Sequence, residues 1–159
     1  MDTATIRMTV LPNDLDFNGH VNNGRYMTLA DVARMDFVVR SGVGRLALKK
    51  GALPVVGDLI AKFRRDLKLF QRFDVQTKIA GWDDKWVFVE HRFVREGRVL
   101  AVVAIRGLFK TAEGPLTPTA FAGDLGVDPQ SPAIPQWIQD WSRSCDAMSQ
   151  ALRQEERAN

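Results

Sequence analysis

The chain has 159 residues, 45% hydrophobic and 26% charged, which is typical of one globular domain able to bury a core without disulfides or metals. The formal net charge of +3 is small, and its Lys and Arg residues are interleaved with acids, so we expect no nucleic-acid binding. The single cysteine excludes an internal disulfide and favours a reducing cytoplasm. Neither a signal peptide nor an apolar run of about 18 residues is apparent, so we expect no membrane insertion.

The N-terminal part predicts a strand, a loop and a long helix. Residues 5–11 alternate partly and stop at Pro12, as in a short strand. Residues 13–23 are rich in Asp, Asn and Gly, which favour loops. Residues 24–40 have a helical period, with Asn23 as the expected cap and apolar side chains on most sides, so we expect this helix to be covered on most sides. Its main apolar stripe comprises Tyr26, Ala30, Ala33 and Phe37.

The middle of the chain predicts an antiparallel sheet. Apolar and polar residues alternate over 59–69 and again over 73–79, as in a sheet with one solvated face. Residues 96–97, Glu-Gly, predict a tight hairpin between strands at 86–94 and 99–109. The run 99–109 is almost wholly apolar, which predicts a strand in the interior of the sheet.

The C-terminal part predicts a strap and an amphipathic helix. Five prolines between residues 115 and 135 leave little room for regular structure. Apolar residues then recur at helical spacing, at Trp137, Ile138, Trp141, Cys145, Met148 and Leu152. The order of strand, loop, long helix and antiparallel strands places the chain in the α+β class, with a sheet wrapped around one helix.

Most of the functional information lies in residues 14–26, which read DLDFNGHVNNGRY. This segment brings carboxylate, imidazole and amide groups into one turn that leads into the long helix. Such a loop can present a base or nucleophile from its side chains, and hydrogen-bond donors from backbone amides, to one substrate atom. That combination is what acyl transfer requires.

The same residues carry a resemblance to a known family, the hotdog-fold acyl thioesterases. The signature D-x-N-x-H-V-N-N-x-x-Y is matched by Asp16, Asn18, His20, Val21, Asn22, Asn23 and Tyr26. Members similar to 4-hydroxybenzoyl-CoA thioesterase carry a catalytic aspartate in a similar loop, at the position of Asp16, and acyl-ACP thioesterases carry D-x-N-x-H-V-N-N. The continuation GRYMTLADVAR resembles the single-hotdog, THEM6-like members.

The resemblance covers roughly residues 5–112 and implies how the chain is organised. Residues 1–112 would form a single hotdog thioesterase domain. Residues 113–159 would form a Pro-rich strap and a C-terminal helix packed on the same domain, with the helix after Pro135 outside the resemblance. Double-hotdog acyl-ACP enzymes are about twice as long, so this chain is expected to form a homodimer or a dimer of dimers.

The resemblance also implies a mechanism that needs no cofactor. Asp16 would attack an acyl-CoA or acyl-ACP thioester directly, or would activate a water molecule. Backbone N–H groups near Asn23 or Gly24 would polarise the thioester carbonyl, and His20 and Asn18 would orient the water or the carboxylate.

Other readings of the site residues stay open. Asp16 and Asn18 are also common turn formers. Tyr26 either contacts the acyl group or belongs to the core. A catalytically idle acyl-binding hotdog protein is the main alternative function. A hotdog hydratase is a further one, but its D-x-N-P-x-H spacing has no counterpart here.

The remaining chemistry-bearing residues have plainer interpretations. We expect His91, inside a strand pattern, to be structural, and Cys145 to lie in the core or an interface. Two histidines and one cysteine far apart in sequence do not make a metal site. A basic series suits either coenzyme A phosphates or simple solvation, and consists of Arg64, Arg65, Lys68 and Arg72.

Overall fold

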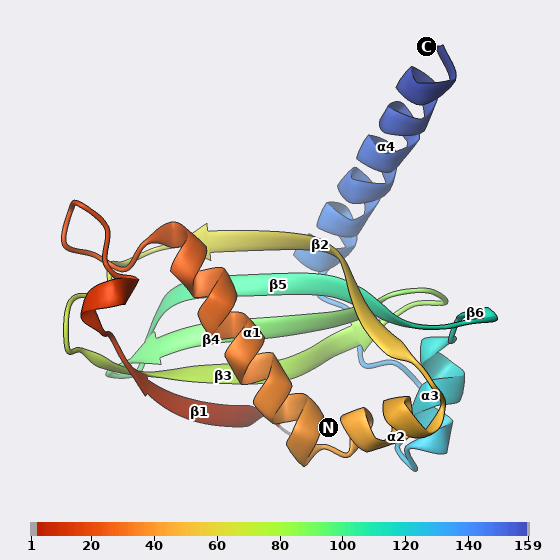
Figure 1. Ribbon diagram of the computed structural model, residues 1–159, viewed down its shortest axis with the longest axis horizontal. Helices are drawn as coiled ribbons and strands as arrows, with labels where there is room; N and C mark the ends of the chain where they lie inside the picture. Colours follow the sequence, from red (N-terminus) through yellow and green to blue (C-terminus); the bar gives the residue numbers. More distant parts are fainter. Residues whose placement is uncertain (1–2, 159) are drawn as a thin grey trace.

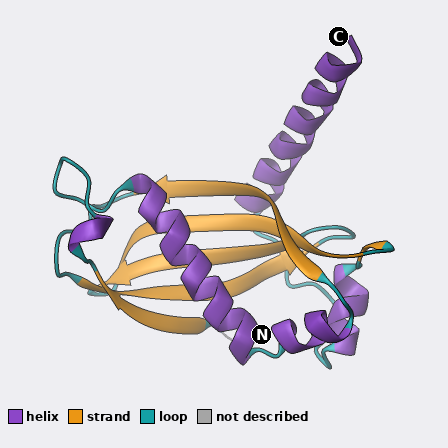
Figure 2. Ribbon diagram, viewed as in Figure 1, coloured by secondary structure: helices purple, strands orange, loops and turns teal. Residues whose placement is uncertain are grey.

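The computed structural model describes residues 3–158 and consists of one curled antiparallel sheet with helices against it (Figure 1). The strands are β1 (Ala4–Thr9), β2 (Leu53–Phe63), β3 (Arg72–Trp82), β4 (Val87–Arg95), β5 (Arg98–Thr111) and β6 (Gly114–Pro115). The helices are the 3-10 turn η1 (Pro12–Asp14), α1 (Asn23–Arg40), α2 (Val43–Lys49), α3 (Pro118–Asp124) and α4 (Gln136–Ala158). The strand order is β1-β3-β4-β5-β2, with β6 paired to β5. Figure 2 shows the sheet curling around α1, which confirms the predicted α+β arrangement.

Helix α1 buries the stripe that the sequence predicts. Tyr26, Ala30, Ala33 and Phe37 are its buried residues. The Tyr26 ring meets Phe63 and Phe93 edge to face, with centroids 5.2 and 5.0 Å apart, an arrangement that aromatic pairs favour. The expectation that α1 is covered on most sides is wrong, because the sheet of a single chain reaches only one side of it. Three apolar side chains of α1 remain 49 to 73% exposed, namely Val32, Met35 and Val39.

The structure differs from the sequence prediction between residues 43 and 71. Helix α2 was not predicted. Strand β2 ends at Phe63, although the alternating pattern continues to residue 69. The amides of Arg64 and Arg65 both donate to the Leu100 carbonyl, at 2.8 and 3.0 Å, which ends regular pairing. The chain then turns inward, and Leu67 becomes fully buried.

The hairpin between β4 and β5 is confirmed. Glu96 and Gly97 have φ values of 51° and 71°, the left-handed conformation that two-residue hairpin turns need. The predicted apolar strand is β5, which has β4 and β2 as neighbours and therefore lies inside the sheet.

The proline-containing stretch is more regular than predicted. Helix α3 begins with Pro118 in its first turn, where a missing N–H costs no hydrogen bond. After α3 the strap passes over the end of β3. The Trp82 amide donates to Ser131 Oγ at 2.8 Å. A Cβ on Gly81 would lie 2.6 Å from Ile134 Cγ1, so only glycine allows this close approach.

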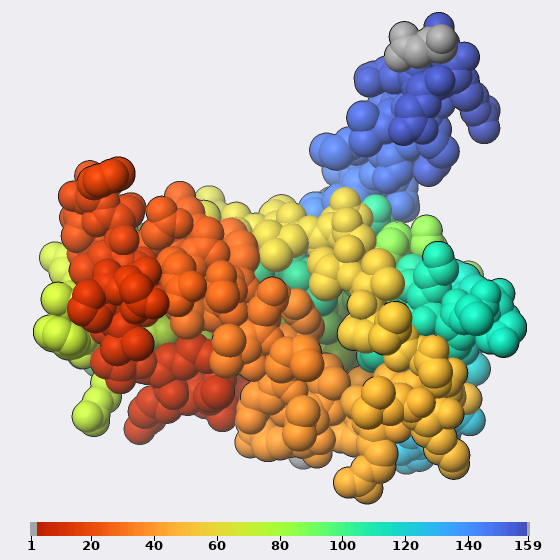
Figure 3. All heavy atoms as spheres, in the orientation of Figure 1, coloured from red at the N-terminus to blue at the C-terminus, as the bar shows by residue number. Residues whose placement is uncertain are grey.

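Helix α4 contacts the sheet with its first half only. Ile138, Ser142 and Cys145 are buried, whereas Met148 and Leu152 are 62 and 52% exposed. Figures 1 and 3 show the C-terminal half projecting away from the sheet. The prediction of an amphipathic helix is confirmed, and part of its apolar face has no cover within this chain.

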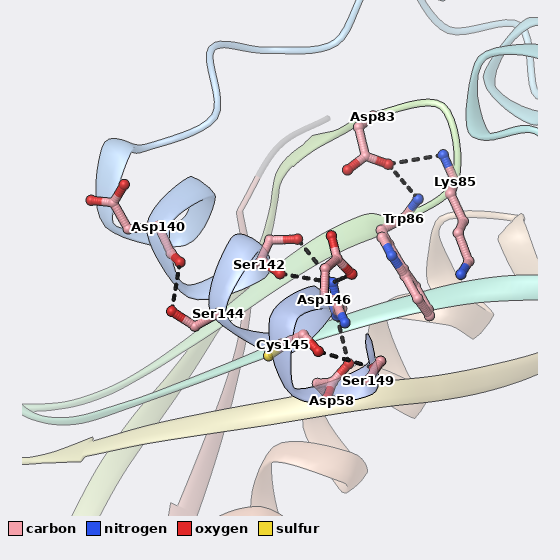
Figure 4. A network of polar contacts seen from close by, with 11 residues as sticks. Asp58, Asp83, Lys85, Trp86, Asp140, Ser142, Ser144, Cys145, Asp146 and Ser149 are labelled. Atoms are coloured by element: carbon pink, nitrogen blue, oxygen red, sulfur yellow. Dashed lines mark hydrogen bonds and ion pairs between the residues drawn. The ribbon is translucent and has the colours of Figure 1, made fainter. Parts of the chain in front are cut away.

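A buried arginine attaches α4 to the outer face of the sheet (Figure 4). Arg106 of β5 donates to Asp58 of β2 at 2.5 Å and to Asp146 of α4 at 2.8 Å. It also donates to the Ser142 carbonyl at 3.1 Å, and its guanidinium stacks 4.6 Å from the Trp86 ring. These contacts join three elements that are distant in sequence.

Within residues 3–158, no helix combines the length and the apolar character that crossing a bilayer requires.

Candidate active-site loop

The loop between β1 and α1 is held by a buried carboxylate, Asp14, which is 3% exposed. Its Oδ2 accepts from the Leu11 amide at 2.8 Å, and its Oδ1 accepts from Arg25 Nε and Nη2 at 2.9 and 2.7 Å. Its carbonyl accepts from the Asn22 amide at 2.8 Å. Sequence analysis missed this anchor, because Asp14 belongs to the loop and Arg25 to the helix, and no period relates residues of two different elements. The anchor fixes both ends of the loop.

Asp16 occupies a tight turn within this loop. Its amide donates to the His20 carbonyl at 2.8 Å, and its carbonyl accepts from Gly19, whose φ of +73° favours glycine. The Asp16 Oδ1 atom accepts from the Asn18 amide at 2.9 Å and from the His20 amide at 3.4 Å. The carboxylate is therefore oriented by backbone N–H groups of Asn18 and His20.

The side chains of Asn18 and His20 point elsewhere. Asn18 is exposed. His20 Nε2 lies 3.7 Å from Asp66 Oδ2, and its backbone pairs with Lys68 as an isolated bridge. The sequence predicts that Asn18 and His20 orient the carboxylate or the water. In the structure, the groups of these two residues that bind Asp16 are their backbone amides.

The start of α1 lies directly after this turn. Asn22 is the N-cap, and its side-chain oxygen accepts from the Gly24 amide at 2.8 Å. The prediction that Asn23 caps the helix is therefore wrong by one residue. The first N–H groups of a helix have no partner inside the helix. Asn22 binds the Gly24 amide through its side chain and the Arg25 amide through its carbonyl, so among residues 3–158 the Asn23 amide is the one left for a ligand.

Tyr26 lies behind the loop, in the core. Its side chain is only 3% exposed, and burial raises the pKa of its phenol. The phenol lies beside the inward turn at Leu67, close enough to the Leu67 backbone for a hydrogen bond that opposes this shift.

An apolar cavity lies near the other end of α1, between that helix, the sheet and α3. Its lining contains none of the residues Asp16, Asn18, His20, Asn23, Gly24 and Tyr26. Among residues 3–158, no three His, Cys, Asp or Glu side chains gather in a group that could hold a metal ion. The chemical groups at the loop are thus a carboxylate and a helix-terminal amide.

Comparison with known proteins assigns the class. Residues 10–142 match the model of the thioesterase-like superfamily. The chain therefore belongs to the thioesterase-like superfamily. The match continues past residue 112, where the sequence resemblance ended, into the first turns of α4.

Individual relatives agree with this assignment. Protein THEM6 of Danio rerio is 37% identical over 153 residues, covering 92% of this chain and 72% of the relative. The crystal structure of YbaW, a probable thioesterase from Escherichia coli, superposes with a TM-score of 0.71 at 20% identity, over 76% of this chain and 94% of that one. A 4-hydroxybenzoyl-CoA thioesterase mutant, solved with 4-hydroxybenzoyl-CoA, superposes with a TM-score of 0.66 at 15% identity, over 77% of this chain and 98% of that one. These neighbours confirm the single hotdog fold.

Proposed function

We propose that the protein hydrolyses an acyl thioester at the loop before α1, with Asp16 as the catalytic carboxylate. The observation that carries this proposal is the position of Asp16. Backbone amides of its own turn hold the carboxylate, which precedes the start of α1, where the Asn23 amide is free for a ligand. Membership of the thioesterase-like superfamily supports the same reaction class.

The reaction needs a polarised carbonyl and a group that delivers oxygen to it. The Asn23 N–H at the positive end of the helix dipole would accept the developing negative charge on the carbonyl oxygen. Asp16 would either attack the carbonyl carbon and expel the thiolate, leaving an anhydride for water to cleave, or remove a proton from an attacking water. Both routes yield a carboxylic acid and a free thiol.

The proposed substrates are thioesters of coenzyme A or acyl carrier protein. The 4-hydroxybenzoyl-CoA thioesterase that shares the fold was solved with an acyl-CoA, which supports the first carrier. The single cysteine is consistent with action in a reducing compartment, which we propose to be the cytoplasm.

We further propose a homodimer formed across α1 and β2. Strand β2 is an edge of the sheet, and unpaired edges invite pairing with another chain. An apolar surface joins this edge to the uncovered side of α1 and comprises Val32, Met35, Val39, Leu53, Val55, Val56, Leu59 and Phe63. A second copy covering this surface would bring the helix starts of the two chains near the interface, and two such dimers could pair further.

Thiol release from a panel of acyl-CoA substrates tests the hydrolysis. Asp16→Asn should lower kcat by about 100-fold or more, the range typical of a lost acid–base group. Asp83→Asn is the matched control, because Asp83 Oδ1 accepts from the amides of Lys85 and Trp86 in a similar turn far from the loop. Equal activity of the two variants would refute the role of Asp16. Acyl-CoA binding without thiol release would favour a non-catalytic acyl-binding protein.

Sedimentation velocity tests the dimer. Leu59→Lys places a charge in the proposed interface, and the wild type should sediment as a dimer while this variant sediments as a monomer. The control is Leu152→Lys, an exposed apolar residue on the projecting half of α4. A monomeric wild type, or an unchanged Leu59→Lys variant, would contradict the proposed interface.

A further inference from the structure

The large cavity behind the C-terminal half of α1 is the strongest unexplained feature of the molecule. It has a volume of about 250 Å³, larger than the engineered apolar cavities of about 150 Å³ that bind benzene. Figure 3 shows its mouth as a hollow between α1 and β2. Met35, Val55 and Val56 of the lining also belong to the proposed dimer surface, so a second copy would close this mouth over a bound chain. Its mouth and floor are apolar and include Met35, Val55, Val56, Ile79, Val89 and Ile105.

Arg34 is the one charged side chain among the described residues that line this cavity. Its Nη2 atom pairs with Asp31, one turn earlier on α1. Its Nη1 atom is buried and has no hydrogen-bond partner among residues 3–158. Because a buried donor without an acceptor costs free energy, this atom marks a place where a ligand acceptor would be bound.

His91 beneath α1 does not supply that acceptor. Its Nδ1 atom lies 2.9 Å from Thr77 Oγ1, and its Nε2 atom is buried without a partner in the described chain. Burial, and then the charge of Arg34, lower the pKa of His91 to about 3, so the ring is neutral at physiological pH. The imidazole near Arg34 is therefore uncharged and does not neutralise a bound anion.

Trp82 provides a second donor in the wall of the same cavity. Its Nε1–H group is also buried without a partner among residues 3–158. The lining of the cavity therefore contains a cation at Arg34 and an indole at Trp82, and its other members are apolar.

We propose that this cavity binds an aliphatic chain that ends in a carboxylate, with the carboxylate on Arg34 and the chain along the apolar walls. A carboxylate gives the guanidinium the charge-assisted hydrogen bonds that it lacks. At about 30 Å³ per group, the volume share of a water molecule, the cavity holds roughly eight heavy atoms. The ligand is a free fatty acid, because a chain that fills the cavity from Arg34 leads away from the loop that carries Asp16. The proposal is therefore independent of the proposed hydrolysis.

Calorimetric titration with octanoate tests the site, with octanol as the uncharged ligand of equal length. The wild type should bind octanoate at least about 10-fold more tightly than octanol, as expected for a hydrogen-bonded ion pair. Arg34→Met should remove this preference, and Arg34→Lys should retain part of it because the charge remains. Arg40→Met is the matched control, since Arg40 forms a similar pair with Asp36 on α1 outside the cavity lining.

The NMR signals of the tryptophan indole N–H groups report where octanoate binds. The sequence has four tryptophans, so the Trp82 signal is identified as the one missing from Trp82→Phe. Octanoate should shift that signal in the wild type and leave it unchanged in Arg34→Met. Equal affinities for octanoate and octanol, or an Arg34→Met variant that binds octanoate like the wild type, would overturn the proposal.

Discussion

His91 should make the stability of the protein depend on pH. Its pKa lies at about 3 in the folded chain against an ordinary value of 6.5, because the ring is fully buried and faces Arg34. Between these values the unfolded chain binds a proton at this residue and the folded chain does not. The contribution of His91 to the free energy of unfolding is therefore fully present above pH 6.5 and is lost as the pH is lowered toward 3.

The size of this effect follows from the linkage relation. Each pH unit corresponds to about 1.4 kcal/mol, so lowering the pH from 6.5 to 4 should cost roughly 3 kcal/mol through His91. His91→Gln removes the titrating group and should lose correspondingly less stability over the same range, whatever its stability at pH 7. Other ionisable groups contribute to both proteins and cancel in the difference.

Urea unfolding followed by circular dichroism at pH 7, 6, 5 and 4 measures this difference. The gap in unfolding free energy between the wild type and His91→Gln should change by about 1.4 kcal/mol per unit below pH 6.5. The unfolding free energy of His91→Gln should rise relative to that of the wild type as the pH falls. A gap that stays constant from pH 7 to pH 4 would show that His91 titrates alike in both states and would refute the reasoning.

Three further predictions concern packing and caps. Gly57→Ala should cost about 1 to 3 kcal/mol of stability in thermal unfolding, because the new Cβ would lie 2.6 Å from Trp86 Cη2. Gly123→Ala is the control and should cost less than about 0.5 kcal/mol, because its new Cβ would have no atom within 4 Å. Asn22→Ala removes the N-cap of α1 and should cost about 1 kcal/mol in urea unfolding, so an unchanged midpoint would argue against the cap. Arg106→Met should cost about 2 kcal/mol and speed proteolytic removal of α4; an unaltered cleavage rate would mean that α4 is held by its apolar contacts alone.

Local features of the fold follow from the sequence. The buried face of α1 was predicted because apolar residues at helical spacing must share one side. The hairpin at Glu96 and Gly97 was predicted because few residues adopt positive φ readily. The motif that contains Asp16 indicated the protein family. Each of these signals depends on residues only a few positions apart.

The chemical arrangement of the loop was only partly predictable. The motif drew attention to Asp16, Asn18 and His20, but it does not say that two backbone amides would hold the carboxylate. Nor does it say that Asn22 would bind the Gly24 amide. These bonds depend on φ and ψ angles in the turn, which several residue types adopt equally well.

The sequence by itself determined the class, the order of the main elements and the loop that carries the motif, because periodicity and turn preference act between near neighbours. Only the tertiary structure decided which distant groups meet. Arg106 reaches Asp58 across 48 positions. Arg34 lies near His91, and lines one cavity with Trp82, only because the sheet curls around α1. No regular spacing in the sequence relates the members of such pairs, so only the folded chain shows which residues meet.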